Sequence, residues 1–323
     1  MGWAMSTDGF DGVLDQCLGV RPGEQVVLLT DGGTDDGVVT RLLEALAARD
    51  GIPLVARMPA PHLPGAEPPG AVAAVMLEAG AVIELTSLFI GSSLARRNAT
   101  GRGVRYLAMP GVRVETFRPG GPLDVDFERL RADAERVGRA WGSAREFRLT
   151  SRGGTDLRGS VEGRPGRVLH GMAREPGAYM APPDIESGTA PVEGTASGTV
   201  VIDGDLLFMG EGPLADAVAL HIEDGQMAGI EGPERARLTS MLARCADDRM
   251  ANLAEVSVAF NPAGTICSVP METESARGTA HIALGNSIAY GGEVNAVAHL
   301  DCVMRDATLE LDGRAVMVEG VVQ

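Results

Sequence analysis

The sequence predicts an α/β N-terminal domain with a parallel sheet, followed by an α+β C-terminal domain that carries a metal site. Two observations predict this division. Strand and helix patterns alternate through the first 145 residues, as in βαβ units. From about residue 146 onward, short strands and glycine turns dominate, and one clear helix interrupts them. We therefore place the two domains at residues 1–145 and 146–323.

Hydrophobic patterning defines the N-terminal elements. Residues 25–30 are aliphatic or β-branched apart from the first, which is typical of a strand buried on both faces. The same reasoning predicts further strands at 52–56, 81–85 and 104–109, helices at 37–49, 71–79, 93–98 and 126–141, and the end of a short helix at 11–18. The alternation indicates a parallel sheet with helices on its faces.

The C-terminal elements are shorter. Strands are predicted at 146–150, 156–161 and 254–260, and a helix at 233–247. Asp-Gly pairs favour the tight turns that join antiparallel strands, so we expect hairpins at Asp203-Gly204, Asp224-Gly225 and Asp312-Gly313.

Composition excludes several classes of protein. The net charge of −16 argues against nucleic acid as the main partner; it fits cation binding, but also a surface that serves only solubility. No apolar run approaches the length of a membrane span, and Met1–Phe10 shows no signal-peptide pattern. The four cysteines, Cys17, Cys245, Cys267 and Cys302, show no paired spacing, so we expect reduced thiols in a cytoplasmic protein without a membrane partner.

Two of the five histidines lie close together near the C-terminus, at His281 and His299. His299 and Asp301 are two residues apart, so on a strand they point to the same face, whereas Cys302 points to the opposite face and is expected in the core. His281 on a neighbouring strand would complete a set of two histidines and one carboxylate, which is a known ligand set for zinc, iron(II) or manganese.

Three glutamates could belong to the same site. Glu255 lies in an otherwise apolar strand, where burying a carboxylate is costly unless it is paired or bound to metal. The other two are Glu186 and Glu274, and each of them could equally be a surface carboxylate. Glu255 could instead face solvent on an edge strand. His281, taken alone, could be a structural histidine. The conjunction of these residues favours a metal site.

The C-terminal half resembles the aminopeptidase T and aminopeptidase S metallopeptidases. The matching segments are Pro183–Glu193, Leu253–Pro262, Gly278–Gly285 and Ala298–Asp301, in the same order as in that family. The resemblance implies that a pair of divalent metals is bound by Glu186, Glu255, His281, His299 and Asp301. It also implies a tyrosine after the first histidine, which Tyr290 matches, and a dimeric or larger assembly.

The same segments are similar to the iron(II) 2,5-dihydroxypyridine dioxygenases. The run from His299 to Gly313 resembles the C-terminus of that family, in which a His-x-Asp pair is followed by a strand ending in Asp-Gly. This resemblance implies that His281, His299 and Asp301 hold a single iron ion.

Our leading interpretation is a metal-dependent hydrolase that cleaves an amide bond in a small peptide or an amino-acid-derived molecule, with zinc, manganese or cobalt. Glu186 is the expected general base or bridging carboxylate, and Tyr290 the second catalytic residue. The alternative is an iron(II) dioxygenase acting on a hydroxypyridine-like ring, and the third interpretation is a metal-binding protein without catalysis. We expect a homodimer in each case.

Overall fold

The computed structural model describes residues 8–210 and 212–323. The expectation of no signal peptide rests mostly on residues 1–7, which lie outside the described residues. Within the described residues, no helix is both long and apolar enough to cross a membrane. The chain forms two compact units, and each is built from more than one stretch of sequence.

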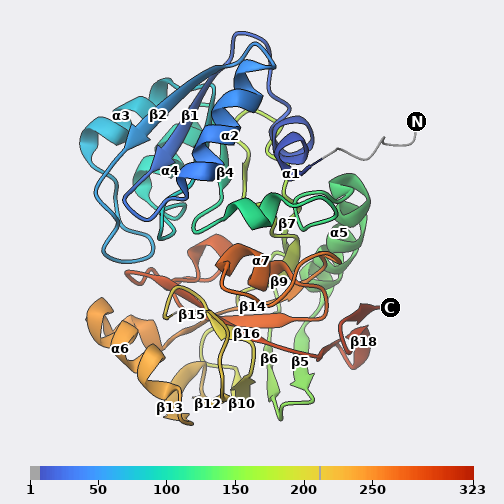
Figure 1. The fold of residues 1–323 in the computed structure, drawn as a ribbon. Coiled ribbons are helices and arrows are strands. Elements are labelled where there is room, and N and C mark those ends of the chain that lie inside the picture. Colours follow the sequence, from blue (N-terminus) through green and yellow to red (C-terminus); the bar gives the residue numbers. More distant parts are fainter. Residues whose placement is uncertain (1–7, 211) are drawn as a thin grey trace. The chain divides into compact units, whose positions relative to one another are not determined.

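The first unit consists of Met1–Leu130, His170–Asp184 and Val269–Glu272. Its centre is a parallel sheet, as predicted, of which β1, β2 and β4 are labelled in Figure 1. The strand order is β2-β1-β3-β4-β8. The strands are β1 (Gln25–Thr30), β2 (Ile52–Arg57), β3 (Ala81–Glu84), β4 (Arg105–Ala108) and β8 (Tyr179–Met180). The helical elements are α1 (Gly9–Asp11), a π-helical turn η1 (Gly12–Leu18), α2 (Asp36–Ala47), α3 (Gly70–Glu78), α4 (Leu94–Gly101) and the 3₁₀ turn η2 (Val114–Phe117).

One face of this sheet packs against α3 and α4. Val27 and Val82 from the sheet join Met76 of α3 and Ala99 of α4 in one buried cluster. Successive strand residues alternate between faces, so strands this apolar require cover on both sides. All residues of β3 and β4 are buried, and the strands are apolar except for Glu84 at the end of β3 and Arg105 at the start of β4.

The second unit consists of Arg131–Leu169, Ile185–Ser268 and Thr273–Gln323, and contains two antiparallel sheets. The eight-stranded sheet has the order β13-β12-β10-β6-β5-β17-β18-β19. Its strands are β5 (Glu146–Ser151), β6 (Asp156–Ser160), β10 (Ser197–Ile202), β12 (Val218–Glu223), β13 (Gln226–Glu231), β17 (Ala307–Leu311), β18 (Arg314–Val318) and β19 (Val321–Val322).

The six-stranded sheet has the order β11-β16-β15-β14-β9-β7. Its strands are β7 (Arg167–Leu169), β9 (Glu186–Thr189), β11 (Asp205–Leu206), β14 (Leu253–Ala259), β15 (Ala280–Gly285) and β16 (His299–Met304). The remaining helical elements are α5 (Phe127–Ser143), α6 (Arg235–Cys245), η3 (Asp248–Ala251), α7 (Pro270–Ser275) and η4 (Ile288–Tyr290). The mixed α/β content with one parallel and two antiparallel sheets agrees with the predicted fold class, while the domain division at residue 145 stays a prediction.

Two of the three predicted hairpins are present. Asp224-Gly225 joins β12 to β13, and Asp312-Gly313 joins β17 to β18. The hairpin predicted at Asp203-Gly204 is wrong, because β10 pairs in the eight-stranded sheet whereas β11 pairs with β16 in the other sheet. The Asp203 side chain instead accepts a hydrogen bond from the Arg305 N–H (2.8 Å), so this turn passes the chain from one sheet to the other.

Candidate metal centre

Four adjacent strands of the six-stranded sheet carry most of the predicted site residues. Glu186 begins β9, Glu255 lies on β14, His281 on β15, and His299 with Asp301 on β16. Antiparallel pairing places Ala283 of β15 opposite both Glu255 and Asp301, so these two carboxylates occupy one row across three strands. A bulge between Leu253 and Glu255 shifts the register of β14, which sets Glu255 in that row.

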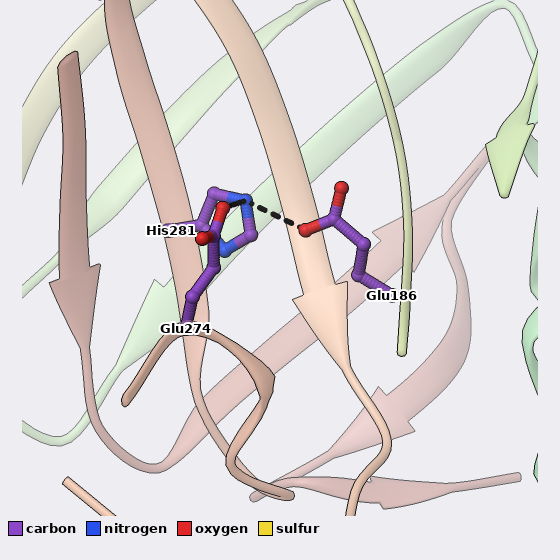
Figure 2. Close-up of side chains that lie close together, drawn as sticks. All are labelled: Glu186, Glu274 and His281. Carbon is purple, nitrogen blue, oxygen red and sulfur yellow. Dashed lines mark ion pairs between the residues drawn. The ribbon is translucent and has the colours of Figure 1, made fainter. Parts of the chain in front are cut away.

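The histidine Nε2 atoms face several carboxylate oxygens at close range. His281 Nε2 lies 3.0 Å from Glu186 Oε2, 3.1 Å from Glu255 Oε1 and 3.6 Å from Glu274 Oε1. Figure 2 shows Glu186 and Glu274 approaching His281, Glu274 from α7. His299 Nε2 lies 2.9 Å from Glu255 Oε2 and 3.2 Å from Asp301 Oδ1. Glu255 therefore contacts both histidines, one with each oxygen.

Hydrogen bonding alone does not satisfy this arrangement. A single His281 Nε2–H cannot serve three carboxylates, and Glu274 Oε2 is buried without a hydrogen-bond partner among the described residues. Ligand atoms bound to one ion at about 2.1 Å lie about 3 Å apart, which is the spacing observed. Two overlapping sets of donors fit a cation: Glu186, Glu274 and His281, and Glu255, His281 and Asp301. The donor set therefore fits a divalent metal ion.

The electrostatics of the cluster point the same way. Burial raises the pKa of Glu186 and, with the charge of Asp301, holds the pKa of Glu274 well above its usual value. For Glu255 burial acts upward, but bonds to His281 and His299 outweigh it and lower its pKa to about 2. Burial also opposes a charge on the two imidazoles, yet their carboxylate neighbours raise the pKa of both. A bound divalent cation would replace these protons, because ligation requires neutral imidazole.

Neighbouring groups orient the candidate ligands. His299 Nδ1 lies 2.7 Å from the Asn286 carbonyl oxygen, which fixes the proton on Nδ1 and leaves Nε2 free to bind metal. The Tyr290 ring stacks on His299 with centroids 5.5 Å apart, and its hydroxyl donates to Glu186 Oε1 at 2.7 Å. The Ser257 hydroxyl donates to Glu255 Oε1. Burial and the charge of Glu186 raise the pKa of Tyr290 well above its usual value, so it remains a donor.

The structure brings all the predicted site residues into one cluster: Glu186, Glu255, His281, His299, Asp301 and Tyr290. Their roles as ligands or catalytic groups stay predictions. Glu274, for which a surface position was equally open, is buried and joins them. Asn286 and Ser257 were missed, although Ser257 follows Glu255 by two residues and so shares its face of the strand. Cys302 is buried, and burial raises its pKa.

Comparison with known proteins decides the family. A family model described as NicX, 2,5-dihydroxypyridine 5,6-dioxygenase, matches residues 6–323, which is almost the whole chain. The chain belongs to this family. A 2,5-dihydroxypyridine 5,6-dioxygenase from Pseudomonas putida is 25% identical over 188 residues, covering 55% of this chain and 54% of that protein. The alignment thus spans about half the length of this relative.

Solved structures support the fold of this family member. A 2,5-dihydroxypyridine dioxygenase from Pseudomonas putida KT2440 superimposes with a TM-score of 0.81 at 20% identity, covering 98% of this chain and 96% of that one. Wild-type AmpT from Thermus thermophilus gives a TM-score of 0.68 at 16% identity, covering 97% and 98%. Both resemblances found in the sequence are therefore confirmed at the level of fold, and membership of an enzyme family together with the donor set indicates a metal-dependent enzyme.

Proposed function

We propose that this chain is an iron(II)-dependent dioxygenase that opens the ring of a hydroxylated pyridine. The family match over residues 6–323 favours this activity over the amide hydrolysis that led the sequence interpretation. The observation that carries the proposal is geometric: on adjacent strands, two histidine nitrogens and the Asp301 carboxylate converge beside Glu255. A two-histidine, one-carboxylate set is the ligand pattern of non-haem iron(II) oxygenases.

His281, His299 and Asp301 would hold the ion, with Glu255 between the histidines. Iron(II), when bound, would supply the activation of molecular oxygen, which amino-acid side chains cannot provide. The side chains of His281 and Glu255 are fully buried, whereas those of His299 and Asp301 are 16% and 12% exposed. Approach of a small molecule is therefore expected from the side of His299 and Asp301.

Glu186 and Tyr290 have a proton-handling role in this proposal. The Tyr290 hydroxyl donates to Glu186 Oε1, whereas Glu186 Oε2 lies 3.0 Å from His281 Nε2. In its ionised form Glu186 can accept the proton that a ring hydroxyl loses as the ring is oxidised. A carboxylate in a buried site with a fixed donor on one oxygen presents the other oxygen in a defined direction, which favours one orientation of the substrate.

The test is oxygen uptake by anaerobically purified protein loaded with iron(II). With 2,5-dihydroxypyridine we expect one O₂ consumed per ring, and none with 3-hydroxypyridine or with iron-free protein. The ratio of O₂ to substrate, measured with an oxygen electrode and by loss of ring absorbance, decides the outcome. Iron-loaded protein that consumes no O₂ but releases amino acids from small peptides would refute the proposal.

Amide hydrolysis remains the second candidate because the two donor sets share His281 and together offer enough carboxylates for two ions. Bound divalent metals would supply an activated water and polarise the amide carbonyl. Glu186→Gln separates the two functions, because it keeps the shape of the side chain and removes its charge. Dioxygenase activity predicts that one iron per chain stays bound while turnover falls. Hydrolysis predicts that metal content falls from two ions towards one and that nearly all turnover is lost.

A further inference from the structure

The connection between β15 and β16 carries residues on which the metal centre depends. It runs from Asn286 to Ala298 and contains the 3₁₀ turn Ile288–Tyr290. Its first residue holds His299 through a carbonyl, and its tyrosine touches both Glu186 and His299. Tyr290 is followed by Gly291 and Gly292, which offer no side chains to hold the turn in place. The Tyr290 and Gly292 N–H groups both donate to the Ser287 carbonyl oxygen at 3.0 Å, which closes the turn from within. Contacts from other parts of the chain then fix where the closed turn lies.

Arg164 and Glu193 form hydrogen bonds to the backbone of this connection. The Arg164 guanidinium donates to the Gly291 carbonyl oxygen at 2.5 Å and forms an ion pair with Glu193. The other Glu193 oxygen accepts the Glu293 N–H at 2.8 Å. The Arg164 side chain is only 11% exposed and that of Glu193 30%, so the pair is largely screened from water. Charge-assisted bonds in such surroundings are stronger than exposed ones.

Residues next to Arg164 and Glu193 make further contacts that hold the same backbone. The Ala190 N–H donates to the Tyr290 carbonyl oxygen at 3.1 Å, and the Thr189 hydroxyl donates to the Pro165 carbonyl oxygen at 2.8 Å. Gly291 has φ +87° and packs so closely on Pro165 that an added Cβ would lie 2.5 Å from its ring. The segment after β9 and the segment before β7 thus hold the backbone of Tyr290, Gly291 and Glu293.

We infer that Arg164 and Glu193 are positioning residues of the metal centre, acting through Tyr290. By fixing the backbone just after Tyr290, at Gly291 and Glu293, they keep its hydroxyl on Glu186 and its ring on His299. Neither residue is among those expected to bind metal or substrate. The inference rests on the proposed metal centre and not on the choice between oxygenation and hydrolysis.

Titration with Co(II) under anaerobic conditions, with a competing chelator, tests this inference without any substrate. Loss of a group that orients a ligand typically weakens metal binding about ten- to a hundred-fold. We expect Arg164→Gln to raise the Kd for Co(II) by about ten-fold. Tyr290→Phe should have a similar effect, and the double variant should be no worse than the weaker-binding single variant, because both changes remove the same contact. Arg164→Lys, which keeps the charge but loses the planar fork, should recover part of the affinity.

Arg152→Gln is the matched control. Arg152 forms an ion pair with Glu319 in the same unit, but their side chains are 67% and 51% exposed. Both residues follow strands of the eight-stranded sheet, β5 and β18, whereas the candidate ligands lie on the six-stranded sheet. Arg152→Gln should leave the Kd for Co(II) within about two-fold of wild type. If Arg164→Gln does not fold, Glu193→Gln replaces it, since an amide oxygen can still accept the Glu293 N–H.

Two results would overturn the inference while leaving the metal centre in place. One is a folded Arg164 or Glu193 variant that melts at a lower temperature yet binds Co(II) as wild type does, because the pair would then be structural only. The other is a double variant with Tyr290→Phe in which the two losses multiply, because Arg164 would then act independently of Tyr290. Wild-type protein that binds no Co(II) would defeat the metal centre itself and the inference with it, a result distinct from either of these.

Discussion

At the scale of single residues, the centre depends on Glu255 bridging two histidines. Both Glu255 oxygens are engaged, at 3.1 Å to His281 and 2.9 Å to His299. The sequence indicates a partner for Glu255, because a carboxylate in an apolar strand is too costly to bury unpaired. The bridging contact was beyond sequence reasoning, because it depends on the bulge that shifts β14 by one residue against β15.

Replacing a single ligand should empty the site. His281→Ala, His299→Ala and Asp301→Ala are each expected to abolish both metal retention and activity, because the remaining donors hold the ion too weakly. Elemental analysis of anaerobically purified variants measures this directly. Full metal content in His299→Ala would show that the candidate ligands are misassigned. Cys302→Ser, adjacent to Asp301 but on the opposite face, is the control and should keep its metal.

At the scale of elements, the site depends on how closely β9 lies against β14. Gly188 of β9 pairs with Ser257, and a Cβ at residue 188 would come within 1.6 Å of the Ser257 hydroxyl oxygen. Only glycine allows this approach, which places Glu186 two residues earlier at the cluster. The strand at β9 was predicted only as a motif segment, because a four-residue run with two small residues carries no periodic signal.

Gly188→Ala should therefore separate the two strands. We expect the free energy of unfolding to fall by about 1–3 kcal/mol from overpacking, together with weaker metal binding as Glu186 moves. Chemical denaturation and the Co(II) titration measure the two effects. Gly70→Ala is the matched control, because a Cβ added there would meet no described residue within 4 Å outside its own helix and chain neighbours, and the φ of Gly70 is not positive. A Gly188→Ala protein as stable as the control would contradict the close approach.

Other elements show where sequence reasoning ends. Strand β1 was predicted with its observed bounds, because the aliphatic run from Val26 to Leu29 carries a strong apolar signal. Strand β8 was missed, since two residues such as Tyr179–Met180 have no periodicity and join the parallel sheet only through pairing with β4. The wrong hairpin at Asp203-Gly204 has the same origin: a turn signal shows that the chain bends, but not which sheet the next strand enters.

At the scale of the whole molecule, stability should depend on a buried acid of the first unit. Glu84, at the end of β3, is fully buried, and burial raises its pKa from 4.5 to about 7 despite hydrogen bonds from Ile90 N–H, Tyr106 and Thr86. The folded state therefore binds this proton more tightly than the unfolded state. The stabilising contribution is fully present below pH 4.5 and is lost as the pH rises through about 7.

The loss corresponds to about 3 kcal/mol for a shift of this size. Glu84→Gln keeps the shape and removes the titration, so its free energy of unfolding should vary less between pH 5 and pH 8 than that of wild type. Denaturation at several pH values in that range measures the difference. Parallel pH profiles for the two proteins would show that folding does not raise the pKa of Glu84. Glu115→Gln, which changes an exposed glutamate of the same unit, is the control.

The assembly prediction also belongs to this scale. The eight-stranded sheet ends in β13 and β19, and exposed strand edges need cover in a stable protein. Together with the resemblance to dimeric families, this leads us to propose a homodimer. Light scattering at micromolar concentration should give twice the chain mass of 33.6 kDa. A single-chain mass under those conditions would rule it out.

The central claim is that the buried histidine–carboxylate cluster serves ring oxygenation. Mass spectrometry of the product formed by iron-loaded protein from 2,5-dihydroxypyridine under ¹⁸O₂ tests it most directly. Opening of the ring by a dioxygenase places both atoms of one O₂ molecule in the product, and His299→Ala should form no labelled product. A product formed under ¹⁸O₂ without label, whose new oxygen therefore comes from water, would contradict the claim and favour hydrolysis.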